Sequence, residues 1–136
     1  RNRSKTKLYL IGQEPIIEAE TSEQSLIKGL FELRDACILL SGHAHYREYP
    51  QIWCQQELTK AGFTVCRHKT FQIKVDRNYL RRQLNVCRSK LPYMATKQLQ
   101  SAMSDEVNRM SEQLYNELNT KPFLSGLRDY VIEAEL

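Results

Sequence analysis

Residues 42–67 constrain the fold most, because they combine a helix end, a loop, a second helix and a strand. Gly42 suits a helix end, since glycine readily adopts the left-handed conformation found there. Pro50 suits the first turn of the next helix, because its fixed φ is already helical and its missing N–H is not needed. Gly62 ends that helix, and the residues that follow it favour β-structure. The chain must therefore alternate helices with strands.

Three segments have the composition of β-strands. Residues 7–11 contain a run of apolar side chains that does not alternate with polar ones, which is typical of a strand buried on both faces in a parallel sheet. Residues 63–75 carry apolar side chains at alternate positions, which predicts one strand or a pair broken near residues 68–70. Residues 130–134 predict a last strand, which follows a turn at Gly126.

Four segments repeat apolar residues every three or four positions, as amphipathic helices do. Thr21 and Gln24 form a capping box before the first of them, and Asp76 is an N-cap for the third. The order of elements predicts an α/β fold with a small mixed sheet of about three strands and four to five helices. A single domain is expected over residues 1–136. The predicted helices span residues 22–40, 51–61, 76–91 and 94–118.

The loop between the first two helices is dense in side chains that bind or titrate. Loops held between rigid elements are common places for binding groups. Arg47 is suited to hold a carboxylate or phosphate, and the tyrosines to hold a polar or aromatic substrate. The alternative is that the charged groups are solvated and the tyrosines anchor the loop. The candidate substrate-binding residues of this loop are His43, His45, Tyr46, Arg47 and Tyr49.

The two loop histidines are also candidates for metal binding. His43 and His45 are two residues apart, so an extended loop would point both imidazoles to the same side. A third ligand such as Glu48 or Cys54 would be needed, and we interpret the histidines as hydrogen-bonding residues. No metal site is predicted. Similarly, Arg34 and Asp35 interrupt the apolar face of the first helix and predict a salt bridge that anchors the helix or the loop.

Composition excludes several classes of protein. The chain has 136 residues, of which 41% are hydrophobic, so it can bury a core. No apolar run approaches the roughly 20 residues that span a bilayer, and no secretory signal is visible. Four irregularly spaced cysteines without a C-x-x-C pair indicate reduced thiols, and we expect a cytoplasmic protein. The five glycines lie far apart, so no glycine-rich nucleotide loop is present.

The predicted helix at residues 76–91 is rich in cations. Arg77, Arg81 and Arg88 share one face, and Arg82 and Lys90 add to the positive charge. Such a face is either solvated or in contact with RNA or an acidic partner. One hypothesis is therefore a small basic α/β binding module for nucleic acid or an acidic protein.

Four stretches of the chain support another hypothesis: KLYLIGQEPI, LRDACILLSGHAHYREYP, WCQQELTKAGFTVCR and DYVIEAEL. Their order resembles the C-terminal half of a class I S-adenosylmethionine-dependent methyltransferase. In that family a late strand ends in a Gly-x-Glu-Pro-like turn and leads to a helix. A helix ending in AGF feeds the next strand, and an antiparallel strand closes the sheet. The resemblance covers nearly all of the chain.

The resemblance implies that this chain supplies strands five, six and seven, with strand seven between the other two. The family's glycine-rich cofactor loop and its acidic ribose-binding residue have no counterpart here. The chain is then a substrate-side portion that binds no cofactor alone and is inactive alone. S-adenosylmethionine is implied for the complete or assembled enzyme. Glu14, at the carboxyl end of strand five, joins the loop residues on the substrate side, and no catalytic residue is carried over.

The same resemblance has a consequence for partners. The strand that begins at Lys7 and ends at Gly12 is left with an unpaired edge where strand four lies in the family. An exposed apolar edge promotes pairing with another strand. We therefore expect a homo-oligomer, or a missing N-terminal half that binds this edge, as in a truncated, cleaved or split enzyme. A small-molecule substrate is the expected ligand.

Overall fold

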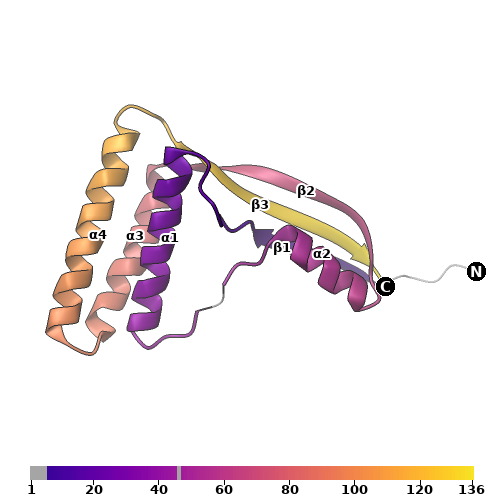
Figure 1. Ribbon diagram of the computed structural model, residues 1–136, viewed down its shortest axis with the longest axis horizontal. Coiled ribbons are helices and arrows are strands. Elements are labelled where there is room, and N and C mark those ends of the chain that lie inside the picture. Colours follow the sequence, from indigo (N-terminus) through magenta and orange to yellow (C-terminus); the bar gives the residue numbers. More distant parts are fainter. Residues whose placement is uncertain (1–5, 46) are drawn as a thin grey trace, which may run out of the picture. The chain divides into compact units, whose positions relative to one another are not determined.

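The computed structural model describes residues 6–45 and 47–136, which form two compact units. The sheet unit contains the described residues up to Ile17, residues 47–73 and residues 127–136. The helical unit contains residues 18–45 and 74–126. The division into two units does not decide whether residues 1–136 form a single domain, so the single domain stays a prediction. The elements are β1 (Lys7–Gln13), α1 (Ser22–Leu40), α2 (Gln51–Lys60), β2 (Thr64–Val75), α3 (Arg77–Lys90), a 3₁₀ turn (Leu91–Tyr93), α4 (Lys97–Leu118) and β3 (Leu124–Glu135) (Figure 1).

The three strands form one sheet in the order β1-β3-β2, so the last strand of the chain is the central one. β3 is antiparallel to both neighbours, and its register with β1 places Leu10 opposite Ile132 and Gly12 opposite Tyr130. The expected position of the last strand between the other two is confirmed. The prediction of a mixed sheet is wrong, because β3 separates the two strands that run in the same direction.

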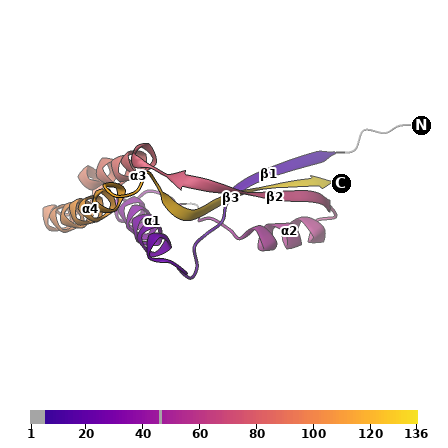
Figure 2. The ribbon, with the colours of Figure 1, turned by 90° about the horizontal axis from the view of Figure 1, so that it is seen from above.

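One face of the sheet is covered by α2 (Figure 2). Leu10 and Ile132 on that face pack with Leu58 of the helix in a small apolar cluster. On the other face, Tyr9 is 59% exposed and Ile11 is 75% exposed. The prediction that β1 is buried on both faces is therefore wrong. Its apolar run is continuous, but among the described residues only one side of the strand carries a covering helix.

The other two strands differ from the sequence prediction, β2 in its continuity and β3 in its length. β2 runs without a break, so the pair of strands with a gap near residues 68–70 is not observed. β3 begins before the predicted turn, and Gly126 lies within it at φ 108°. A Cβ at Gly126 would lie 2.3 Å from Cγ of Gln24, so glycine is required there by contact as well as by conformation. The strand continues through this glycine despite its positive φ, and Leu124 and Leu127 on either side of it are buried.

The helical unit is a three-helix arrangement in which α1, α3 and α4 all pack on one another. The N-caps follow the sequence prediction. Thr21 Oγ1 accepts a hydrogen bond from Gln24 N at 3.1 Å, and an Asp76 carboxylate oxygen accepts one from Tyr79 N at 2.9 Å. Gly42 leaves α1 at φ 81°, as predicted. The side chains of the three helices that form the core are Ile27, Leu30, Cys37, Leu80, Leu84, Cys87, Val107, Met110, Leu114 and Leu118.

None of the helices in the described part of the chain combines the length and apolarity needed to cross a bilayer. The four cysteines are free thiols, and two of them lie in the core of the helical unit. Burial raises the pKa of the Cys87 thiol to about 12, and the pKa of Cys37 is raised for the same reason. These two thiols are therefore packing residues that stay protonated, because the reactive thiolate is disfavoured.

Candidate functional site

The predicted substrate-binding residues belong to both units. His43 and His45 are in the helical unit, whereas Glu14, Arg47 and Tyr49 are in the sheet unit. Tyr46 lies outside the described residues. The five described residues therefore form two groups with different surroundings.

In the sheet unit, Glu14 follows β1 and faces the first turn of α2. Its carboxylate accepts a hydrogen bond from the backbone N–H of Gln51 at 3.1 Å, and its own N–H donates to the Arg128 carbonyl at 2.9 Å. A carboxylate at a helix N-terminus is stabilised by the unpaired N–H groups and by the helix dipole. Glu14 therefore fixes the start of α2 at the carboxyl end of β1.

Tyr130 of β3 completes this connection. Its side chain is 2% exposed, and its hydroxyl donates to the Tyr49 carbonyl at 2.6 Å and lies 3.3 Å from Cys54 Sγ. Burial raises the pKa of Tyr130, and the contact with Cys54 acts in the same direction, so the hydroxyl remains a donor. The ring also covers Gly12, where a Cβ would lie only 2.6 Å from it. Glycine at this position thus allows β1 and β3 to pair around the tyrosine.

The segment that these contacts hold presents an aromatic surface to solvent. The rings of Tyr49 and Trp53 stack with 4.5 Å between centroids, and the two residues are 46% and 43% exposed. Arg47, two residues earlier, is also exposed. An exposed pair of rings is suited to a planar group, and an exposed guanidinium is suited to a negatively charged one.

In the helical unit, His43 is tied to the end of α1. Ser41 Oγ donates to the Ile38 carbonyl at 2.7 Å and lies 2.7 Å from His43 Nδ1. Because the hydroxyl hydrogen is used on the carbonyl, Nδ1 of His43 carries the proton in this bond. The imidazole also meets the Tyr93 ring edge-on, with 5.4 Å between centroids. His43 therefore secures the exit of α1.

His45 lies beside a paired carboxylate. Its Nε2 atom is 3.1 Å from Asp35 Oδ1, at ion-pair distance but not aligned as a hydrogen bond. Arg34 holds the same oxygen through Nε and Nη2, both at 3.2 Å, and reaches Gln83 of α3 at 3.0 Å. The predicted salt bridge between Arg34 and Asp35 is confirmed. His45 is placed against it, which gives this histidine an anchoring role.

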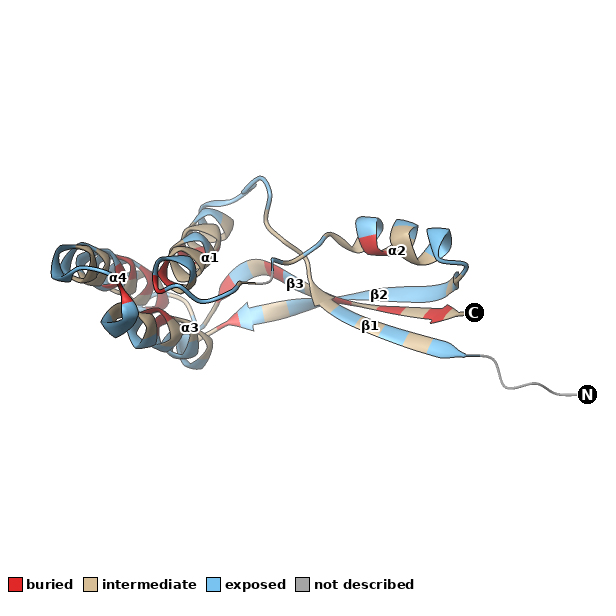
Figure 3. Ribbon diagram, turned by 90° about the horizontal axis from the view of Figure 1, so that it is seen from below, coloured by how far each residue is buried: buried red, intermediate tan, exposed pale blue. Residues whose placement is uncertain are grey.

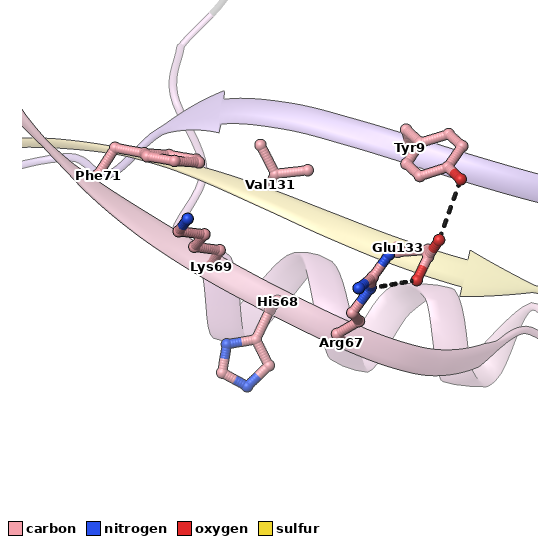
Figure 4. Close-up of a pocket in the computed structure, with 7 residues that line it drawn as sticks. All are labelled: Tyr9, Arg67, His68, Lys69, Phe71, Val131 and Glu133. Atoms are coloured by element: carbon pink, nitrogen blue, oxygen red, sulfur yellow. Dashed lines mark hydrogen bonds and ion pairs between the residues drawn. The ribbon is translucent and has the colours of Figure 1, made fainter.

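A shallow groove of about 310 Å³ lies on the sheet unit (Figure 4). Tyr9 donates to Glu133 at 3.0 Å, and Arg67 donates to the other oxygen of the same carboxylate at 2.7 Å. The hydrogen bond from Arg67, followed by that from Tyr9, lowers the pKa of Glu133. The carboxylate is thus satisfied and the rest of the groove is largely apolar. The groove is lined by Tyr9, Arg67, His68, Lys69, Phe71, Val131 and Glu133.

Sequence reasoning selected Glu14 and Tyr49 but missed Trp53 and Tyr130. Trp53 is the single tryptophan of the chain and lies four residues after Tyr49. Side chains at this spacing meet on a helix, so the spacing could have predicted the aromatic pair. Tyr130 carries no such signal, because its partners lie about 80 residues away in the sequence.

No family model matches this chain, and no curated protein matches it. The contacts of the described residues and the order of the motifs are therefore the basis for assigning a function.

Proposed function

We propose that this chain is the C-terminal, substrate-side portion of an S-adenosylmethionine-dependent methyltransferase, without the cofactor-binding loop and inactive alone. The observation that supports it best is the strand order β1-β3-β2 with a reversed central strand. Class I methyltransferases have strand seven in this position, antiparallel between strands five and six. α2 precedes β2 and ends at Gly62, in the position of the family helix that ends in AGF.

The contacts around α2 support a substrate-side role. Glu14 and Tyr130 hold the start of the helix at the carboxyl end of β1, the edge of open α/β sheets where ligands bind. Arg47, Tyr49 and Trp53 are exposed side chains next to these anchors. In the proposed enzyme they contact the methyl acceptor, with the rings against a planar group and the guanidinium toward an anionic one.

In this proposal the cradle for S-adenosylmethionine lies outside this chain. Gly12 is the glycine that ends the apolar part of β1, and the Tyr130 ring fills the space beside it. The cofactor supplies the methyl group in this class of enzyme, so its site must be contributed by another part of the enzyme.

The outer edge of β1 is where we propose that this other part binds. Within the described residues, β1 pairs only with β3 on its inner side. Lys7 is the one charged residue in the strand, and Tyr9 and Ile11 are exposed beside the free edge. Natural edge strands that stay unpaired usually carry charges, prolines or bulges, whereas this strand carries a single charge at Lys7 and no proline. The partner is a missing N-terminal half, and a second copy of the chain is the alternative.

The proposal can be tested on the protein from its own cells. A tagged chain is isolated under mild conditions, mixed with radiolabelled S-adenosylmethionine and irradiated with ultraviolet light, which crosslinks bound cofactor to protein. The purified 136-residue chain is treated in the same way for comparison. We expect label in the native assembly, together with a second polypeptide, and none in the purified chain. A native assembly without label would contradict the methyltransferase role. Label on the purified chain would contradict the location of the cofactor site outside it, and an assembly made only of this chain would contradict the missing half.

A further inference from the structure

α3 has an exposed face of unusual composition. Every exposed residue on this helix is an arginine, an asparagine or a serine, and the helix contains no carboxylate. The exposed face of α4, by contrast, mixes acidic residues such as Asp105 and Glu112 with Lys97 and Arg109. Figure 3 shows the exposed residues of α3 in pale blue. They are Arg77, Asn78, Arg81, Arg82, Asn85, Arg88 and Ser89.

The direction of this face is fixed by the core of the helical unit. Leu80, Leu84 and Cys87 are fully buried at spacings of four and three residues, so the opposite side of α3 must face solvent. Asp76, the carboxylate before the helix, is used as its N-cap. The basic side chains are therefore presented on a rigid helix.

Among the described residues, the cations of α3 make contacts with uncharged groups. Arg81 donates to Asn78 at 2.9 Å, and Arg82 stacks over the Tyr79 ring. In the part of the chain that the structure describes, no carboxylate forms an ion pair with α3, whereas Arg109 of α4 is paired with Glu106. A guanidinium without a carboxylate partner has its positive charge and its N–H donors available to bind an external anion.

We infer that this face of α3 binds the phosphate backbone of duplex DNA. Arginine, asparagine and serine are typical donors to phosphate oxygens. The helix exposes no large apolar side chain of the kind that anchors protein interfaces, and no exposed ring on which unpaired bases would stack. A helix with side chains is about 10–12 Å wide, which matches the major groove of about 12 Å. This inference goes beyond the proposed methyltransferase role and does not depend on it.

The geometry gives the expected strength of the salt dependence. Arg77 is held against the end of α4, where it donates to Asn119 at 2.9 Å and to the Leu118 carbonyl at 3.5 Å. We therefore count as the phosphate contacts Arg81, Arg82 and Arg88, because the contacts given above for Arg81 and Arg82 stay within α3. About three contacts give a slope of about −2.7 in log K against log salt. The association constant should then fall about 40-fold between about 50 and 200 mM salt.

The test is fluorescence anisotropy of a labelled duplex of about 20 base pairs, titrated with the full chain at both salt concentrations. The variant R81Q/R82Q/R88Q should bind about tenfold more weakly or worse at low salt. The matched control K60Q/K97Q/R109Q removes three cations from α2 and α4 and should bind within about twofold of the unchanged chain. Thermal melting of each variant, followed by circular dichroism, establishes that its fold is retained.

Several results would overturn the inference. Absence of binding at low salt, or equal weakening by both triple variants, would show that α3 is not the contact surface. Equal or tighter binding to polyglutamate would indicate an acidic protein as partner. Tighter binding to single-stranded nucleic acid or to duplex RNA would contradict the assignment to duplex DNA.

Discussion

The hydroxyl of Tyr130 offers the sharpest test of the contacts that hold α2. Tyr130→Phe keeps the ring over Gly12 and removes the hydroxyl, which donates to the Tyr49 carbonyl at 2.6 Å and lies 3.3 Å from Cys54 Sγ. Loss of a net hydrogen bond, with a partly buried carbonyl left unpaired, costs about 1–2 kcal/mol. The sheet unit should therefore unfold at a lower urea concentration, by roughly 0.5–1 M for an ordinary dependence of stability on urea.

The measurement uses the fluorescence of Trp53, the single tryptophan, which stacks on Tyr49 within the sheet unit. The matched control is Tyr9→Phe. Its hydroxyl donates to Glu133 at 3.0 Å but is exposed, so its loss should cost less than about 0.5 kcal/mol. Equal urea midpoints for the two variants would refute the reasoning, because the buried and the exposed hydroxyl would then contribute alike.

The same residue predicts a dependence on pH. The pKa of Tyr130 in the folded protein is raised above its ordinary value of 10.0, chiefly by burial. The folded state therefore holds the proton more tightly, and this contribution to stability is complete below pH 10 and is lost as the pH rises above it. The difference in stability between the unchanged chain and Tyr130→Phe should shrink in alkaline solution. A difference that stays constant up to about pH 11 would contradict the raised pKa.

Two further substitutions test other contacts. Gly12→Ala should destabilise the sheet unit by about 1–3 kcal/mol, because the new methyl group would overlap the Tyr130 ring, and urea unfolding followed by Trp53 fluorescence measures this. Glu23→Gln should lower helical stability by about 1 kcal/mol, read by circular dichroism, with Glu106→Gln as the exposed control. The pKa of Glu23 is lowered chiefly by the Lys121 hydrogen bond, so its stabilising effect is complete above about pH 4.5 and is lost as the pH falls below that value. A Glu23→Gln effect that persists unchanged in acid would contradict this assignment.

The sequence by itself determined the elements that depend on near neighbours. The N-caps at Thr21 and Asp76 each use a backbone N–H three residues away, so their side chains and spacing suffice to predict them. Gly42 ends α1 because of its own conformational freedom. The order of the strands was also predicted, but from the resemblance of the motifs to a family.

The tertiary structure alone decided which faces are covered and which site residues meet. The apolar run of β1 could not reveal that one side lacks a covering helix, because burial depends on what packs against a strand. The sequence could not decide whether β2 is one strand or two for a similar reason, since pairing with β3 maintains the strand through polar residues. Of the anchored cluster at α2, Glu14 and Tyr49 were predicted and Tyr130 was not. Tyr130 meets Tyr49 across about 80 residues of sequence, and such a contact exists only once β3 has entered the centre of the sheet.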